Sequence, residues 1–275
     1  MKMLWILALK ELRDGLRNRW VAAAILLLGS LALALSLLGS APTGSVNASK
    51  LDVTVISLAS LSVYLIPLIA LMLSFDAMVS EFERGTMMLL LTYPVTRWQV
   101  VMGKFLGHLL ILFIAILAGY GSALLILMYI SGGDTEGWQA YVMMMLSSLM
   151  LGAVFIALGY IISVYVKERA SAAGAAIGVW LMFVVMYDLI LFAVLLMDEQ
   201  QLMSQQLLSV LMLISPTDSY RILNLSLFEG VSQASGIAGI VSQAGISVVT
   251  LWVVMLAWVV FPLGATLLMF QRREL

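Results

Sequence analysis

Six long apolar stretches with a single carboxylate among them constrain the fold of this chain more than any other feature. A hydrocarbon core about 30 Å thick requires about 20 residues of apolar helix, and each stretch is long enough to cross it. The composition agrees, since 63% of the 275 residues are hydrophobic and only 11% are charged, unlike a soluble globular domain. We predict an all-α polytopic membrane protein whose six transmembrane helices occupy Trp20–Gly39, Val53–Phe75, Phe105–Ile130, Trp138–Val166, Ser171–Met197 and Ile246–Phe270.

These stretches, numbered spans one to six along the chain, leave no room for a separate soluble catalytic domain. We expect one transmembrane domain over residues 1–275, with an interfacial helix at 1–19, a cytoplasmic loop at 76–104 and an extracytoplasmic loop at 198–245. In span five, the stretch SAAGAAIG gives Gly174 and Gly178 the spacing that allows close helix contact.

The cations lie almost entirely on one side of the predicted spans. Of the 14 lysines and arginines, only Lys50 and Arg221 fall on the other side. Loops rich in Lys and Arg stay in the cytoplasm, so we expect both termini to be cytoplasmic. The cations on that side are Lys2, Lys10, Arg13, Arg17, Arg19, Arg84, Arg97, Lys104, Lys167, Arg169, Arg272 and Arg273.

The segment before span one has the pattern of an amphipathic helix. Apolar residues recur at helical spacing and cations lie on a neighbouring face, which is typical of a helix lying in the inner membrane interface with its cations on lipid phosphates. A solvated helix ahead of the span is the alternative. The apolar residues are Trp5, Leu9, Leu12, Leu16 and Trp20, and the cations are Lys10, Arg13 and Arg17.

Few side chains have the chemistry of a catalytic site. Cysteine is absent and His108 is the only histidine, which excludes thiolate chemistry and a histidine-rich metal centre. The pair Gly103-Lys104 lacks the first glycine and the hydroxyl of a phosphate-binding loop. We expect no nucleic-acid partner and no ATP bound by that route.

Asp188 is the one carboxylate predicted inside a span, where an ionisable group is usually functional. A proton relay or ion site needs several such groups, so a structural hydrogen bond or a pair with Arg221 is an equal alternative. The 19 methionines carry thioethers that bind Cu(I), but filling of apolar helix interfaces is the interpretation we favour. The candidate metal ligands are Met197, Met203 and Met212.

The stretch SEFERGTMMLLLTYPVTRWQVVMGK, residues 80–104, is apolar in its middle but too short there to span. Proline disfavours helix at the residue before it, so we expect one helix to end near Tyr93 and a second to begin after Thr96. Two short helices would lie against the inner membrane face, either as a simple connection or as a docking element for another protein.

This stretch also carries a resemblance to a known family. The run EFERGTMMLLLTYPVTR, from Glu81 to Arg97 and followed by Gly103-Lys104, resembles the signature of ABC-2 type permeases, and KELRDGLRNR is similar to the family's opening motif. The six-span plan, like that of type V exporters, extends the resemblance over the whole chain. Together with the outer SPTDSYRILNL, these motifs are most similar to the permeases that serve copper-centre maturation of nitrous-oxide reductase.

The resemblance implies a homodimer in the bacterial inner membrane, with two separate ATPase subunits that bind ATP and Mg and a periplasmic β-helical partner. The permease itself would be no enzyme and would bind no cofactor. Its cargo would be copper, a sulfur species, or no cargo if it only transmits force. The resemblance assigns the principal coupling element to Glu81, Glu83, Arg84, Gly85 and Thr86, its turn to Tyr93, Pro94 and Arg97, and a minor contact to Lys167, Glu168 and Arg169.

The outer loop is long and partly apolar. Ser215 or Thr217 is positioned to cap a helix that begins near Pro216, which predicts two short helices that dip back into the outer rim. We expect their exposed ends to form an outer gate or a dock for the periplasmic partner, with Tyr220 and Arg221 as anchors. A lid that packs only on its own spans is the alternative.

Other functions remain open from the residues alone. An ABC-2 exporter of a drug or lipid would share these motifs. An ion-coupled carrier would need no ATPase, and an intramembrane enzyme would depend on His108 or a serine.

Overall fold

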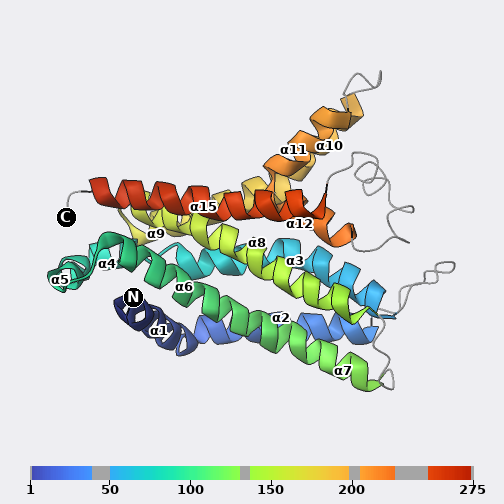
Figure 1. Ribbon diagram of the computed structural model, residues 1–275, viewed down its shortest axis with the longest axis horizontal. Helices are drawn as coiled ribbons and strands as arrows, with labels where there is room; N and C mark the ends of the chain where they lie inside the picture. Colours follow the sequence, from blue (N-terminus) through green and yellow to red (C-terminus); the bar gives the residue numbers. More distant parts are fainter. Residues whose placement is uncertain (1, 39–49, 131–136, 198–204, 227–246, 274–275) are drawn as a thin grey trace.

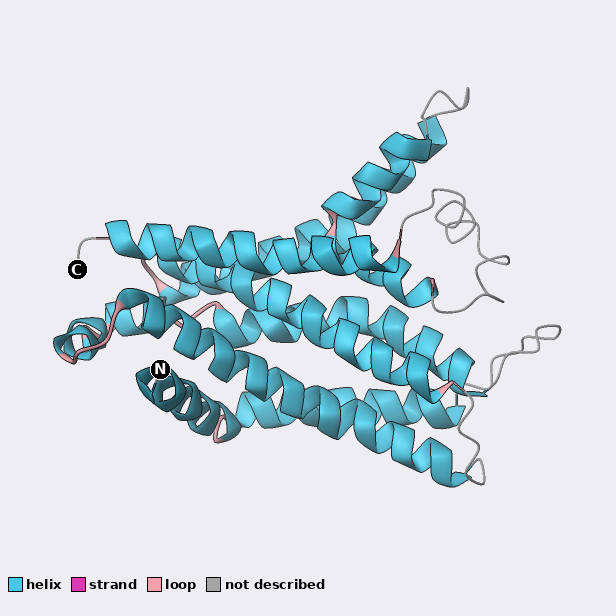
Figure 2. Ribbon diagram, in the orientation of Figure 1, coloured by secondary structure: helices cyan, strands magenta, loops and turns pink. Residues whose placement is uncertain are grey.

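The computed structural model describes residues 2–38, 50–130, 137–197, 205–226 and 247–273. Within these residues the chain forms helices and short loops and no strand, as Figure 2 shows. The helices are α1 (Lys2–Leu16), α2 (Arg19–Leu38), α3 (Lys50–Ser74), α4 (Val79–Glu83), α5 (Thr86–Thr92), α6 (Arg97–Ile116), η1 (Leu117–Gly121), α7 (Ser122–Ile130), α8 (Trp138–Tyr165), α9 (Arg169–Leu181), η2 (Met182–Met186), α10 (Tyr187–Met197), α11 (Gln205–Ile214), α12 (Pro216–Leu225) and α15 (Val248–Arg272).

Six helical stretches of the described residues are long and apolar enough to cross a membrane, which confirms the predicted fold class. Span one is α2, span two is α3, span four is α8 and span six is α15. Spans three and five are each interrupted by one π-helical turn, η1 and η2.

Helix α8 is the centre of the bundle, packed between α3 and α15. Of the apolar segment of α8, 61% is buried, compared with 6% of the corresponding segment of span five. Span five therefore presents most of its surface outward.

Both termini lie at one end of the bundle, together with α1, α4 and α5 (Figure 1). We call this end the basic end, because the described cations other than Arg221 and Lys50 gather there. At the opposite end, α10 and α11 lean away from the bundle.

The π-turn η1 places Tyr120 in the bundle interior. Tyr120 Oη lies 2.7 Å from Ser62 Oγ of α3, and Tyr141 Oη of α8 donates to the Tyr120 carbonyl at 2.8 Å. A π-turn interrupts the regular ladder of helical hydrogen bonds. The Tyr141 hydroxyl donates a hydrogen bond to a carbonyl of this turn.

The break predicted before Pro216 is confirmed. Helix α11 ends at Ile214, and Ser215 is the N-cap of α12, with Asp218 N donating to Ser215 Oγ at 3.2 Å. Proline at the first helical position lacks only an N–H that would have no partner in the helix. Helix α12 then packs against α8, α15 and α3, and most of its side chains are buried.

Candidate functional site

The short helix α4 lies at the basic end, where the chain leaves span two. Its first backbone amides have no partner within the helix, and Met78 N and Val79 N both donate to Ser163 Oγ of α8, at 2.8 and 3.1 Å. Span four therefore fixes the start of α4.

A left-handed glycine separates α4 from α5. Gly85 has φ +67°, a conformation that residues with a Cβ rarely adopt, and the Thr86 hydroxyl donates back to the Glu81 carbonyl at 3.3 Å. Helix α5 projects from the basic end (Figure 1). Its Leu89 and the following Tyr93 are both 65% exposed, so apolar surface is available at this tip.

The predicted helix break at Pro94 is confirmed, since α5 ends at Thr92 and α6 begins at Arg97. The second helix is not short, however, because it is the beginning of span three. The turn is closed by a capping box in which Thr96 N donates to Gln99 Oε1 at 3.0 Å. Arg97 was expected to shape this turn, but its guanidinium instead reaches the end of α15.

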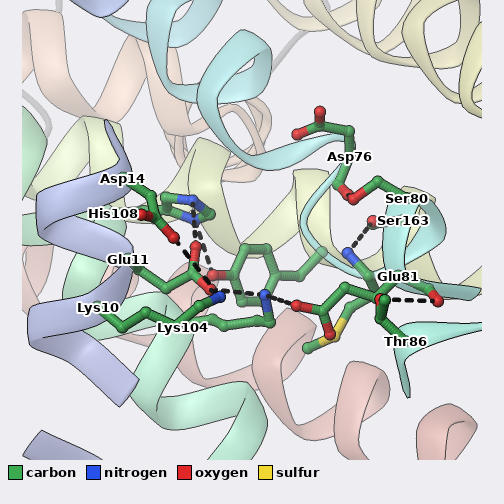
Figure 3. Close-up of polar contacts among 12 residues, drawn as sticks. Lys10, Glu11, Asp14, Asp76, Ser80, Glu81, Thr86, Lys104, His108 and Ser163 are labelled. Carbon is green, nitrogen blue, oxygen red and sulfur yellow. Dashed lines mark hydrogen bonds and ion pairs between the residues drawn. The ribbon is translucent and has the colours of Figure 1, made fainter. Parts of the chain in front are cut away.

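Lys104 is the centre of a buried ion network (Figure 3). Its Nζ lies 2.7 Å from Glu11 Oε1 of α1 and 2.7 Å from Glu81 Oε1 of α4, and its side chain is only 4% exposed. Two carboxylates thus share one ammonium group, and Glu81 Oε2 is buried without a hydrogen-bond partner among the described residues. This network connects the N-terminal helix, α4 and span three.

The pKa of Glu11 reflects two opposing effects. Burial of the carboxyl is the largest single effect and raises its pKa, but the positive charge of Lys104, the smaller effect of His108, the hydrogen bond from the Lys104 ammonium group and the effect of Lys10 together outweigh burial and lower the pKa to about 2. Glu11 is therefore ionised at neutral pH and balances the buried ammonium.

Helix α1 approaches α6 closely because two glycines face it. A Cβ on Gly103 would lie 2.8 Å from Leu7 Cβ, and one on Gly107 would lie 2.6 Å from Glu11 Cβ. The neighbouring His108 shares a 2.8 Å hydrogen bond with Tyr160 Oη of α8. His108 is therefore a satisfied polar neighbour in this network.

Span five is also tied to α4. Glu83 Oε1 accepts from Arg169 N, the first amide of α9, at 2.6 Å, and Arg169 Nη2 lies 2.7 Å from Asp76 Oδ2. A carboxylate is favoured at a helix N-terminus. Arg169, a residue of the predicted minor contact, is therefore bonded to the predicted principal coupling element. Lys167 and Glu168, the other two residues of the minor contact, are exposed beside it.

A hollow of about 660 Å³ opens between α1, α4, α5 and α6. Charged side chains of the ion network line it, and so do Arg84 and Tyr93. The lining includes Lys10, Glu11, Asp14, Asp76, Glu81 and Lys104.

The outer polar residues form a second group. Arg221 Nη1 lies 2.6 Å from Asp188 Oδ2 and 3.2 Å from Asp218 Oδ1, so the predicted pairing of Asp188 with Arg221 is confirmed. Burial, and next the charge of Asp188, raise the pKa of Asp218 to about 6 against the opposing effect of Arg221.

The expectation that Tyr220 stands on an exposed helix end is wrong. Tyr220 is fully buried, and its hydroxyl shares a 2.9 Å hydrogen bond with Ser148 of α8. The amphipathic pattern of α12 turns this side inward, because α12 packs into the bundle. Tyr220 is therefore unavailable as a surface anchor in this structure, and Arg221 already has two carboxylate partners.

The candidate methionines do not share one environment. Met197 is exposed at the end of α10, Met212 is buried in α11, and Met203 lies outside the described residues. Within the described part of the chain, no three His, Asp or Glu side chains are grouped to hold a metal ion.

Glu11, Ser163 and the role of Lys104 were not predicted from the sequence. The stretch GKFLGH does indicate the close contact with α1, because Gly103 and Gly107 have the same close-contact spacing as the two glycines of span five. Lys104 and His108 repeat at that spacing and lie beside the contact with α1.

Nearly the whole chain is similar in sequence to known proteins. Residues 5–275 match the family described as ABC-2 family transporter protein. The chain is 44% identical over 275 residues to the "Probable ABC transporter permease protein NosY" of Stutzerimonas stutzeri, covering 99% of each chain. It is 43% identical over 278 residues to the protein of the same description from Pseudomonas aeruginosa, covering all of both chains.

Proposed function

Because this chain belongs to the ABC-2 family of transporter proteins, we propose that it is the permease subunit of a complex in which two separate ATPase subunits drive its movement. ATP and Mg bind to those subunits, and this chain contributes the coupling surface. The observation that carries the proposal is the position of α4, which touches spans three, four and five through Glu81, the amides at Met78 and Val79, and Glu83.

The exposed tip formed by α5 is the surface we assign to docking. Met88 and Leu89 of α5, and Tyr93 directly after it, are all more than half exposed, and α5 projects beyond the bundle. Aromatic residues and methionine are enriched at the centres of protein interfaces. A push on this tip is passed to α4 through a single left-handed residue, Gly85.

The orientation we propose rests on the distribution of the cations. With the basic end in the cytoplasm of a bacterium, as the positive-inside rule favours, α5 would be accessible to separate ATPase subunits on that side. Helix α1 then lies along the inner interface, with Trp5, Ile6 and Leu9 exposed toward lipid.

Span five is the surface we assign to a second copy of this chain. Only 6% of its apolar segment is buried, and a Cβ on Gly174 or Gly178 would meet no atom of the described chain within 4 Å. Such a small-residue face permits close packing of another helix. A Gly178→Cys variant should form a disulfide-linked dimer in membranes, and a variant that stays monomeric under oxidation would remove span five from the dimer interface.

The biological role we propose is assembly of the copper centres of nitrous-oxide reductase, with a periplasmic β-helical protein above the permease. The permease would move copper or a sulfur species across the membrane, or would only transmit force. This part rests on the motif resemblance and on full-length similarity to the two NosY permeases.

Replacing Glu83 and Arg84 together by alanine tests the coupling role. We expect normal membrane insertion but loss of ATPase docking or of permease-dependent ATPase activity, because both side chains are exposed at the end of α4, next to the projecting α5. Asp14→Ala is the matched control, since Asp14 is exposed on α1 and pairs only with Lys10 among the described residues. Full coupled activity in the double variant would show that the segment is only a connector.

A further inference from the structure

The C-terminal end of span six is capped by an arginine from span three. Arg97 Nη1 lies 2.6 Å from the Phe270 carbonyl, 2.7 Å from that of Gln271 and 3.4 Å from that of Arg273. The last carbonyls of a helix have no donor within it and carry partial negative charge. Arg97 therefore stabilises the final turn of α15.

A second arginine returns the contact. The guanidinium of Arg273, just beyond α15, lies 4.0 Å from the centre of the Phe82 ring, and it donates to the Val164 carbonyl in the last turn of α8. Phe82 belongs to α4, and its ring packs edge-on against Phe270 with centroids 6.0 Å apart. Cations over aromatic faces are held by the ring quadrupole. We call Phe82, Arg97, Phe270 and Arg273 the C-terminal clasp.

The clasp completes a pattern in α4. Three consecutive residues of this helix reach three different spans: Glu81 contacts Lys104 of span three, Phe82 contacts Phe270 of span six, and Glu83 accepts from the first amide of span five. A displacement of α4 cannot leave the end of span six in place without separating two contacts of the Phe82 ring, one with Phe270 and one with the Arg273 guanidinium.

We propose that Arg97 and Arg273 make the final turn of span six part of the coupling element, so that α4 moves span six together with spans three and five. The proposal rests on the proposed function, since it takes α4 to receive its motion from an ATPase subunit. Both arginines are positioning residues, because they hold the helix end against α4 and touch no cargo.

Hydrogen exchange on the purified permease tests the clasp without any ATPase. Arg97→Ala should speed exchange of the last-turn amides of α15 by about tenfold, the order expected for losing charge-assisted hydrogen bonds. Arg272→Ala is the control, because this neighbouring exposed side chain takes no part in the clasp. Equal exchange in the two variants would overturn the capping role.

Two single-cysteine reporters then test transmission, since the chain has no cysteine of its own. A fluorophore on Thr92→Cys reports on α5, and one on Gln271→Cys reports on the end of span six. In the complex with ATPase subunits, we expect ATP to change both signals. Arg97→Ala and, independently, Arg273→Ala should abolish the change at position 271 and leave that at position 92.

The outcomes separate the two proposals. An unresponsive reporter at position 92 in the otherwise unaltered complex would overturn the proposed function. A responsive position 92 with an unresponsive position 271 would overturn only the clasp proposal. An undiminished response at position 271 in both arginine variants would overturn it as well.

Discussion

Removing the charge of Lys104 should destabilise the protein more than any other single change at the basic end. Lys104→Met keeps the length of the side chain but leaves Glu11 and Glu81, each 2.7 Å from the lost ammonium, without their cation. Breaking a buried ion pair by removing one partner costs about 3–5 kcal/mol. For a chain of this size, such a loss lowers the unfolding midpoint by on the order of 10 °C.

Two further variants make the magnitude interpretable. Lys10→Met removes a cation that is 54% exposed and lies 3.4 Å from the same Glu11, and an exposed pair contributes less than about 1 kcal/mol. The triple variant Glu11→Met, Glu81→Met, Lys104→Met removes all three charges together, and replacing a whole buried ion network by apolar side chains of similar size is often close to neutral.

Thermal unfolding in detergent, followed by far-ultraviolet circular dichroism, measures all three variants. We expect a large loss for Lys104→Met, a negligible one for Lys10→Met, and recovery of most of the loss in the triple variant. If the triple variant is as unstable as Lys104→Met, or if Lys104→Met unfolds at the same temperature as the wild type, the buried ion network does not stabilise the basic end.

Four other predictions concern pH, the outer charges and topology. The contribution of Glu11 to stability, with its pKa lowered from 4.5 to about 2, is complete above about pH 4.5 and is lost as the pH falls toward 2, so Glu11→Gln should remove that part of the acid unfolding curve. The pKa of Asp218 is raised from 3.8 to about 6, so its contribution has the opposite sign: stability should fall as the pH rises from about 4 to 6, and Asp218→Asn should abolish this slope. Arg221→Gln should lower the unfolding midpoint, because Asp188 and Asp218 lose their shared cation. The decrease should be smaller in an Asp218→Asn background. Equal decreases in the two backgrounds would show that the ion pair between Arg221 and Asp188 does not depend on Asp218. Membrane-impermeant thiol reagents should label Ser247→Cys but not Arg169→Cys in intact spheroplasts, and the reverse pattern would invert the topology.

Much of the fold could be predicted because the length and apolarity that define a membrane helix are properties of its local sequence. Length and apolarity alone located the six spans. Proline and a capping hydroxyl located the breaks at Pro94 and before Pro216. The π-turns in spans three and five were not predicted, since no run of apolar residues distinguishes a π-turn from an α-turn.

The contacts of the site depend on tertiary packing and could not be read from local patterns. Glu11 and Lys104 are 93 residues apart, and Arg97 and Phe270 are 173 apart. The motif that included Arg97 pointed to the correct region, but not to the helix end that its side chain caps. Tyr220 was misplaced for a related reason, because an amphipathic helix shows which face is apolar and not what covers that face.

We expect an ATPase subunit to act on this permease at the tip formed by α5. A photoreactive amino acid in place of Leu89, which is 65% exposed on α5, tests it directly in living cells. The control carries the same group in place of Val249, which is 70% exposed at the opposite end of span six. We expect a crosslink from position 89 to an ATPase subunit and none from position 249. An ATPase crosslink from position 249 with none from position 89 would show that α5 is not the docking surface.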